Sequence, residues 1–332
     1  MKIFITGILG MVGSRTAIRF LKEGHEVTGI DNGFRSDFIK ASEDITIHDE
    51  LIKLGAMISA MDIVDLKPEH IEGYDVVIHT AAQPSHEYSI TQPKIDFYVN
   101  AKGTFKLLDA CRQLKDKPIV IYTSTIKVYG DVINQFDYTE GKLRYFLEEP
   151  ESFDETISID GDGHSPFGVS KLAADLYCQE FAKLYKMDIG VFRLGCITGP
   201  THRGVELHGF LSYLIKCGAM GKEYNIFGNG KQVRDQIHVE DLIDAFKEFI
   251  DDPKSGVYNL GGGIENSTSI LEAINTLDIN YGIKINYTHK PERFADHKYW
   301  VTDNSKFMRN YHGWSIKRDL KSIFKDIINF YK

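Results

Sequence analysis

The segment HSPFGVSK, residues 164–171, holds two side chains whose spacing bears on proton transfer. The pattern predicts the start of a helix, in which Phe167 and Lys171 lie one turn apart on the same face. A tyrosine at position 167 would exchange a proton through its phenol, and Lys171 would lower the pKa of that phenol. Phenylalanine can do neither. The segment therefore belongs to an enzyme that moves its proton through another group, to an inactive copy, or to no proton-transfer site at all.

A second segment, TGILGMVGS, places Gly7, Gly10 and Gly13 between a strand-like run and a helix-like run. Glycines at this spacing allow a tight turn and let a pyrophosphate approach the backbone at the helix N-terminus. Asp31 ends the next strand, where a carboxylate accepts hydrogen bonds from an adenosine ribose. Together these residues predict a dinucleotide site, and Asp31 favours NAD because a carboxylate repels a 2′-phosphate. Arg35 could reverse that preference, but a solvated loop arginine is the commoner case.

Ordered elements must position these residues, and the first half of the chain alternates two kinds of segment. The strand-like runs are KIFIT, HEVTGID, GAMISAM, YDVVIHTA and PIVIYTS, and the helix-like stretches include MVGSRTAIRFLKEG and QPKIDFYVNAKGTFKLLDACRQLK. Strands that are apolar throughout are buried on both faces, which favours a parallel sheet covered by helices. The sequence therefore predicts an α/β fold with a doubly wound parallel sheet of the Rossmann type.

Beyond about residue 200 the alternation becomes less regular. The segments GVELHGFLSYLIKCGAM and LKSIFKDIINFYK are predicted to be helices among short strands. We predict a dinucleotide-binding domain over residues 1–200, joined by a segment that returns near 233–260. Residues 201–332 are predicted to form a smaller C-terminal α/β region that binds the substrate and packs on the sheet.

Composition excludes several classes of protein. The chain has 332 residues and a formal net charge of -8, without a basic cluster, so we expect no nucleic-acid partner. The four cysteines lie far apart without metal-ligand spacing, which favours neither a disulfide framework nor a zinc site and fits a reducing cytoplasm. No run of about 18 apolar residues and no signal-peptide pattern occurs, so we expect neither membrane insertion nor secretion.

Several motifs together carry a resemblance to a known family. They are TGILGMVGS, MDI at 61–63, HTAAQ at 79–83, STIKVYG at 124–130 and the helix that contains Lys171. In this combination the chain resembles the extended short-chain dehydrogenase/reductase family, which modifies nucleotide sugars with bound NAD. The segments AAQPSH, STIKVYGD, GVELHGFLSYL, GNGKQVRDQIHVED and YNLGGG are similar to the CDP-paratose/CDP-tyvelose 2-epimerase branch of that family.

The resemblance implies a set of cofactor-binding residues. Lys171 matches the lysine that binds the nicotinamide ribose, and Asp62 and Ile63 match the pair that meets the adenine. Asn100 is expected in the helix behind the nicotinamide. The full implied set is Gly7, Gly10, Met11, Val12, Gly13, Asp31, Asn32, Arg35, Asp62, Ile63, Ala81, Ala82, Gln83, Asn100, Thr123 and Lys171.

The resemblance also implies how the substrate is held. Thr125 matches the hydroxyl that bonds the reacting sugar oxygen, and Arg234 and Arg293 match arginines that hold the pyrophosphate through bidentate contacts. Dehydratases of the superfamily place an acidic pair where Ile126 and Lys127 stand here, so a 4,6-dehydratase is disfavoured. The implied substrate-binding residues are His86, Thr125, Tyr129, Cys196, His202, Arg234 and Arg293.

Phe167 stands where the family has its proton-accepting tyrosine, so another group must act if the chain is active. Candidates are His86, His164, Tyr129 and Cys196, and the histidines rank first because an unperturbed imidazole titrates near pH 6.5. We therefore expect Thr125, Phe167, Lys171, His86 and His164 at the catalytic centre. His202 and His208, with Glu206 between them, lack the spacing of a zinc helix, so no metal is expected and they are assigned to the mouth of the nucleotide site.

The interpretation is an NAD-dependent epimerase that inverts C2 of a CDP-linked deoxyhexose through a transient keto sugar. Two alternatives stay open: a 4-epimerase or related oxidoreductase acting on a UDP sugar, and a protein that binds NAD or a nucleotide sugar without turnover, including a variant changed to trap substrate. The family pairs its two long helices, here about 91–115 and 167–186, across a two-fold axis, which implies a homodimer and leaves a tetramer open. Their apolar residues include Phe105, Leu107, Leu108, Leu172, Leu176, Tyr177 and Phe181.

Overall fold

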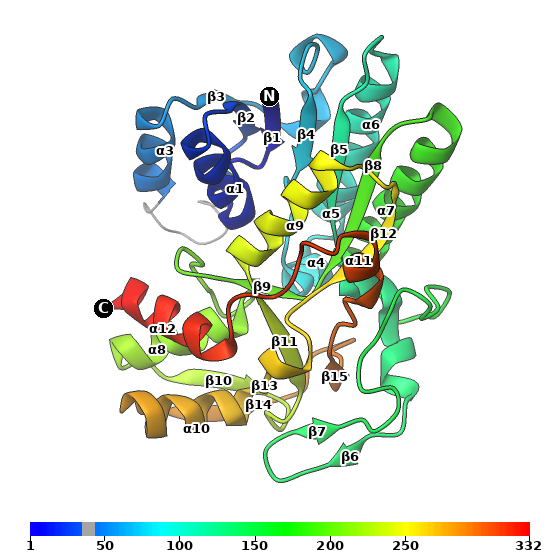
Figure 1. Ribbon diagram of the computed structural model, residues 1–332. Coiled ribbons are helices and arrows are strands. Elements are labelled where there is room, and N and C mark those ends of the chain that lie inside the picture. Colours follow the sequence, from blue (N-terminus) through cyan, green and yellow to red (C-terminus); the bar gives the residue numbers. More distant parts are fainter. Residues whose placement is uncertain (35–43) are drawn as a thin grey trace.

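A seven-stranded parallel sheet lies at the centre of the computed structural model, which describes residues 1–34 and 44–332 (Figure 1). Its strands are, in spatial order, β12 (Gly256–Leu260), β8 (Ile189–Leu194), β5 (Ile119–Thr125), β4 (Val76–His79), β1 (Lys2–Thr6), β2 (Glu26–Asp31) and β3 (Met57–Ala60). The predicted doubly wound fold is therefore confirmed. Arg35 lies outside the described residues.

Helices cover both faces of this sheet (Figure 1). One face carries α1 (Met11–Lys22), α3 (Asp44–Lys53) and α9 (Val239–Asp251), and the other carries α6 (Thr104–Gln113) and α7 (Ser165–Tyr185). The strand order reverses between β1 and β4, so the connections that follow these strands turn to opposite sides. This reversal leaves a crevice at the carboxyl ends of the two strands, where open α/β sheets bind ligands.

Strand β1 shows why the apolar runs fold into this layer arrangement. Ile3 and Ile5 are fully buried in the apolar cluster under α1 and α9. Phe4 points to the opposite cluster, where it shares a core with Leu107 of α6. Since successive side chains of a strand point to opposite faces, only a run that is apolar at every position suits a sheet covered on both sides.

The C-terminal region adds smaller sheets below the central one (Figure 1). Strands β9 (Cys196–Thr198), β11 (Val233–His238), β13 (Ser267–Ser269) and β15 (Tyr299–Trp300) form one sheet, and β10 (Tyr224–Phe227) pairs with β14 (Tyr287–Lys290). Helices α8 (Phe210–Met220), α10 (Ile270–Tyr281) and α12 (Leu320–Tyr331) share an apolar cluster with β10. None of the helices within residues 1–34 and 44–332 is long and apolar enough to cross a bilayer.

Helix α8 begins later than the sequence predicts. The segment GVELHGFLSYLIKCGAM was expected to be helical from residue 204, but Val205 and His208 pair through their backbones and Gly209 adopts a left-handed conformation with φ 79°. Gly209 reaches this conformation without the steric cost that a β-carbon would add. The helix therefore starts at Phe210, and the residues before it form a loop beside the crevice.

The long helix predicted over QPKIDFYVNAKGTFKLLDACRQLK is present and contains an irregularity. It runs through α5 (Pro93–Asp96), a π-helical stretch (Phe97–Gly103) and α6. A β-carbon on Gly103 would lie 2.6 Å from Cγ2 of Ile63, so the helix can approach the loop after β3 only with glycine there. The π-helical stretch contains Asn100, whose side chain is buried against the β4 loop. Such stretches are common beside functional sites.

A buried ionic network joins the sheet to α7. Asp175 is fully buried and its carboxylate accepts two hydrogen bonds from Arg193 of β8, at 2.9 and 3.1 Å. Ser124 of β5 donates to the same carboxylate at 2.7 Å, and Arg193 also donates to the phenol of Tyr129. Tyr129 in turn donates to Asn259 of β12 at 2.7 Å. The network therefore fixes α7, and with it Phe167 and Lys171, relative to three strands.

Replacing Arg193→Met should lower the free energy of unfolding by about 3–5 kcal/mol, because it leaves the carboxylate of Asp175 buried without a cation. Urea titration followed by circular dichroism measures the change. As control, Lys67→Met removes an exposed cation from a 3.9 Å ion pair and should shift stability by less than about 0.5 kcal/mol. Equal losses for the two variants would contradict a special role of the buried network.

Candidate functional site

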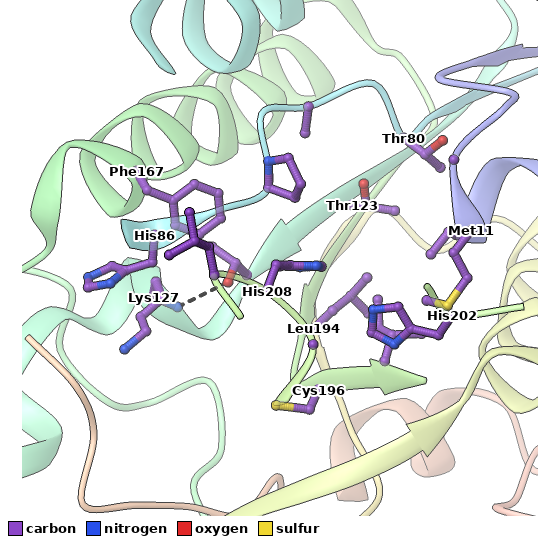
Figure 2. Close-up of a pocket in the computed structure, with 18 of the residues that line it drawn as sticks. Met11, Thr80, His86, Thr123, Lys127, Phe167, Leu194, Cys196, His202 and His208 are labelled. Carbon is purple, nitrogen blue, oxygen red and sulfur yellow. Dashed lines mark hydrogen bonds between the residues drawn. The ribbon is translucent and has the colours of Figure 1, made fainter. Parts of the chain in front are cut away.

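The main cavity among the described residues opens at the carboxyl ends of β1, β4 and β5, at the reversal of the strand order. It has a volume of about 450 Å³, within the range of small-molecule sites. Figure 2 shows side chains from distant segments that meet there, including Met11, Thr123, Phe167 and Cys196. The cavity therefore brings together the glycine loop, the Phe167 helix and the C-terminal region.

The glycine loop is packed too closely to accept side chains. Gly7 has φ 71°, and a β-carbon there would lie 2.7 Å from the backbone nitrogen of Ala81. A β-carbon on Gly13 would overlap the carbonyl oxygen of Gly7. Helix α1 begins after Gly10 without a side-chain cap, so its first N–H groups are available to an anion. Met11 and the neighbouring loop residues line the cavity, in the order Gly7, Gly10, Met11, Val12 and Gly13.

Asp31 lies at the end of β2 and shapes this loop as well as lining the cavity. Its carboxylate accepts backbone hydrogen bonds from Leu9 at 3.0 Å and Gly33 at 2.9 Å. Asn32 and Ile63 also line the cavity, whereas Asp62 does not. The Asp62 side chain accepts from Asn32 at 2.8 Å and caps the turn at Val64, so it supports this part of the cavity from outside.

The loop after β4 divides into lining and supporting residues. Ala81 and Ala82 line the cavity. Gln83 is fully buried, and its amide donates to Ser85 and Asp96 instead of facing the cavity. Asn100 accepts from the Gln83 backbone at 2.9 Å and donates to Ser170 of α7 at 3.0 Å. Gln83 and Asn100 thus hold the loop against α7 rather than line the cavity.

Phe167 and Lys171 both line the cavity from α7, one helical turn apart as predicted. The ring of Phe167 is 7% exposed and supplies an aromatic wall without a proton donor. Lys171 donates to the Thr123 carbonyl at 2.6 Å and lies 4.5 Å from the centre of the Tyr122 ring. Burial lowers the pKa of the Lys171 ammonium to about 8. The hydroxyl of Thr125, also in the cavity, accepts the backbone N–H of Lys127 at 3.3 Å.

A second lysine, Lys127, lies half-buried in the same cavity. Lys127 donates to the Ala295 carbonyl at 2.8 Å, and its ammonium lies 3.7 Å from the carboxylate of Asp296. Burial lowers the pKa of Lys127 to about 8, against the attraction of Asp296. Arg234 donates to Asp296 at 2.6 Å and to its own neighbour Val233. Although burial acts to raise it, these cations hold the pKa of Asp296 well below its usual range. Arg234 therefore lies in the cavity as half of an ion pair.

His86 forms another cluster with Glu87 and Arg293. A Glu87 oxygen lies 3.6 Å from Nδ1 of His86 and 3.6 Å from Nε of Arg293. Burial and the nearby Lys127 cation lower the pKa of His86 to about 4, so its ring is neutral at neutral pH. Arg293 donates to the Glu206 carbonyl at 2.7 Å and stacks 4.0 Å from the Phe227 ring centre. Its Nε is buried without a hydrogen-bond acceptor, and its nearest carboxylate is that of Glu87.

The structure does not bring His164 or Tyr129 to the cavity lining. The His164 ring donates through Nε2 to Gly161 at 2.9 Å and packs against the backbone after β5. Tyr129 is fully buried, stacked 5.2 Å from the Trp300 ring and bonded to Asn259. Its pKa is raised to about 12 by burial. Tyr129 is therefore engaged in the protein interior and the half-buried His164 is bonded to neighbouring backbone, and neither lines the cavity.

Cys196, His202 and His208 do line the cavity. Burial raises the pKa of the Cys196 thiol to about 11, which leaves it protonated at neutral pH. The rings of His202 and His208 lie 5.7 Å apart, and His202 approaches Thr198 at 3.3 Å. Within residues 1–34 and 44–332, no group of three or more His, Cys, Asp or Glu side chains is arranged to hold a metal ion.

Comparison with known proteins places this arrangement in a family. The NAD dependent epimerase/dehydratase family matches residues 3–261, which span the central sheet and its crevice. The chain belongs to this family. Its cofactor is accordingly NAD, and the uncapped N-terminus of α1, the close-packed glycines and Asp31 fit the pyrophosphate and the ribose of that cofactor.

Relatives extend over the whole chain. CDP-paratose 2-epimerase of Salmonella typhi is 33% identical and covers 97% of this chain and 96% of its own length. UDP-glucose 4-epimerase of Mycolicibacterium smegmatis is 25% identical, and the match covers 100% of this chain and 99% of that protein. One solved structure is a Tyr-to-Phe variant of UDP-glucuronic acid 4-epimerase from Bacillus cereus, crystallised with a fluorinated UDP-glucuronic acid and NAD. It has a TM-score of 0.81 at 24% identity, and the match covers 100% of this chain and 99% of that chain. That structure shares the fold of this chain.

Sequence reasoning missed several residues that the fold adds to the site, among them Glu87, Lys127 and Asp296. Lys127 was noted only as a reason to disfavour a dehydratase, although its place two residues after Thr125 was a usable signal. Asp296 had no such signal, because it reaches the cavity from a loop between β14 and β15. Local sequence patterns do not reveal contacts between residues that lie so far apart along the chain.

Replacing Gly13→Ala should weaken NAD binding on the order of tenfold or more, because the added β-carbon collides with backbone of the loop that holds the pyrophosphate. Isothermal titration calorimetry measures the affinity. Gly256→Ala is the matched control, since its nearest neighbours would lie 3.8 Å away, and its NAD affinity should equal that of the unmodified protein. Unchanged affinity in Gly13→Ala would count against pyrophosphate binding at this loop.

Proposed function

We propose that this NAD-dependent nucleotide-sugar epimerase inverts C2 of a CDP-linked deoxyhexose. The observation that carries the proposal is the 33% identity with CDP-paratose 2-epimerase, which extends over 97% of the chain and includes both the glycine loop and the C-terminal wall of the cavity. In such an epimerase the sugar is oxidised to a ketone and reduced on its other face. Bound NAD supplies the hydride acceptor and donor for that carbon.

Each lining side chain has a part in this proposal. Lys171, fixed by Thr123 and the Tyr122 ring, holds the nicotinamide ribose. The Thr125 hydroxyl bonds the reacting sugar oxygen, and the Phe167 ring forms a flat apolar wall beside it. Because few waters fit against such walls, hydrogen bonds to the sugar are stronger than they would be in solvent.

We assign both arginines of the cavity to the pyrophosphate. Each already lies beside a carboxylate: Nε of Arg293 is 3.6 Å from Glu87, and Arg234 donates to Asp296 at 2.6 Å. A pyrophosphate would therefore share both guanidinium groups with these carboxylates. His202 and His208, with Cys196, line the remaining wall toward the nucleotide and sugar.

Two alternatives rest on specific observations. Identity of 25% with UDP-glucose 4-epimerase over the full chain favours a UDP sugar that reacts at C4. Phenylalanine at position 167 favours a protein that binds its nucleotide sugar without turnover. The first alternative differs in the substrate, and the second differs in the chemistry.

Incubation with CDP-paratose or CDP-tyvelose in D2O should interconvert the two sugars with retention of hydrogen at C2, since hydride returns directly to the same carbon. Proton NMR of the sugar resolves both points. UDP-glucose and UDP-glucuronic acid serve as controls and should stay unchanged. Conversion of a UDP sugar alone would replace the proposed substrate. Binding of CDP-sugar without conversion, together with turnover in Phe167→Tyr, would identify a substrate-binding protein that lacks its proton acceptor.

We also propose that the protein is a homodimer formed through its long helices. Leu107, Leu108 and Phe181 are buried inside the protomer, but other apolar side chains on the same helices are exposed. Those exposed side chains are Phe97, Tyr98, Phe105, Leu176 and Tyr177. The rings of Phe105 and Tyr177 lie 5.2 Å apart, so exposed apolar side chains of the two helices meet. Exposed apolar side chains that gather in this way are typical of a protein–protein interface.

Replacing Leu176→Glu should convert the dimer to a monomer, because it places a charge in the centre of the apolar face. Multi-angle light scattering during gel filtration measures the mass. The control Ile279→Glu introduces the same charge at an exposed position of α10 and should leave the mass unchanged. A dimer that persists in Leu176→Glu would locate the interface elsewhere.

A further inference from the structure

Loss of the phenol at position 167 leaves the proton of the reacting hydroxyl without its usual acceptor. The nearest polar groups must then come from elements that surround Phe167. Figure 2 shows Phe167, His86 and Lys127 in one part of the cavity, and the Lys127 side chain extends from the segment that follows β5. The carbonyl of Lys127 also contacts the first turn of α7, since a β-carbon on Gly168 would lie 2.8 Å from it. The backbone of Lys127 is thus fixed beside Thr125 and Gly168, the residue after Phe167, and its side chain lines the same cavity.

We propose that the amine of Lys127 accepts the proton of the reacting sugar hydroxyl, in place of the phenol that position 167 lacks. The proposal rests on the proposed function, because it concerns the proton transfer of that reaction. Lys127 lies two residues after Thr125, the hydroxyl assigned to the same sugar oxygen, and both residues line the cavity. Its amine is held by the Ala295 carbonyl at 2.8 Å and lies 3.7 Å from Asp296, which also lines the cavity. It is therefore a half-buried, oriented and titratable group in the cavity.

The other titratable side chains of the cavity are less suited to this step. Cys196 stays protonated, because burial raises its pKa to about 11. His86 is a weak base, because its pKa is lowered to about 4. Asp296 accepts a hydrogen bond from Arg234, and its pKa lies well below its usual range, so it is a weaker base than His86. A general base works best when its pKa lies near the working pH. Lys127 and Lys171, each with a pKa lowered to about 8, meet this condition.

Lys171 also has a lowered pKa, and its surroundings separate it from Lys127. The partners of Lys171 are Thr123 and the Tyr122 ring, both in the central sheet. The partners of Lys127 belong to the C-terminal region that forms the far wall of the cavity. We therefore assign Lys171 to the cofactor and Lys127 to the sugar.

The chemistry requires neutral Lys127 at the start. Its lone pair takes the hydroxyl proton as the sugar carbon loses hydride, so a carbonyl forms and the amine becomes an ammonium. The oxidant is the bound nicotinamide cofactor of the proposed reaction, and the ammonium returns the proton when hydride is delivered to the other face. Atoms and charge balance over the cycle, and no further reactant is needed.

The charge environment sets how the reaction depends on pH. Acidic or thiol groups that favour protonated Lys127 are Asp296, Asp131 and Cys196, and Arg234 opposes them. Lys127 in turn lowers the pKa values of His86 and His297, so both rings face it as neutral groups. With a pKa of about 8, roughly a tenth of Lys127 is neutral at pH 7, and turnover should rise with pH and level off above about 8.

Lys127→Arg is the informative substitution, because a guanidinium keeps the positive charge beside Asp296 but does not deprotonate in proteins. It should lower kcat on the order of 100-fold or more and remove the rise of activity with pH, while NAD affinity changes less than about twofold. Introducing Phe167→Tyr into Lys127→Arg should restore turnover to within about tenfold of Phe167→Tyr alone, since a phenol then accepts the proton. A merely structural role of Lys127 would leave the double variant as inactive as Lys127→Arg.

Two further measurements distinguish a failure of the assignment to Lys127 from a failure of the proposed function. NMR of protein labelled with ¹³C at the lysine ε-carbon, assigned with Lys127→Met, should give Lys127 a pKa near that of the kinetic profile, without any substrate present. His86→Gln should retain the pH profile of the unmodified protein. Full activity in Lys127→Arg, or a profile lost in His86→Gln, would overturn the assignment to Lys127. Failure of the unmodified protein to convert any CDP sugar would instead overturn the proposed function.

Discussion

The alignment of β1, β4 and β5 in one parallel sheet is the constraint on which the site depends. Backbone pairing places Thr6 beside His79 and His79 beside Tyr122, so β1 and β4 end at the same level and β5 continues beyond them to Thr125. The strand order reverses between β1 and β4, which leaves a crevice there rather than a packed helix. The glycine loop, the alanine loop and Thr125 all follow directly from these strand ends. Loss of that register would separate the cofactor loop from the substrate wall.

Close packing then fixes the cofactor half of the site with little use of side-chain chemistry. Gly7 and Gly13 meet backbone atoms at distances that exclude any β-carbon, and Asp31 ties the same loop through two N–H groups. Gln83 and Asn100 hold the neighbouring loop from behind. This half is therefore rigid before a ligand binds, which reduces the entropy cost of binding.

Another part of the cavity holds partly buried charged groups that lie in pairs. Lys127 and Arg234 lie beside Asp296, and Arg293 lies beside Glu87, next to the neutral ring of His86. Partial burial would penalise any of these charges alone, so each cation is held beside a carboxylate. The same burial lowers the pKa of Lys127 and makes a lysine able to exchange protons near neutral pH. In this part of the cavity, burial thus accounts both for the pairing of the charges and for the lowered pKa of Lys127.

The sequence by itself determined the doubly wound fold, the glycine loop with Asp31, and the spacing of Phe167 and Lys171. Each is a local signal, because strand burial, tight turns and helical periodicity act over a few residues. The tertiary structure alone decided that Tyr129 and His164 turn away from the cavity and that Lys127 meets the Ala295 carbonyl, 168 residues later in the chain. Such contacts depend on how the C-terminal region packs on the sheet, and no local pattern of residues encodes that packing.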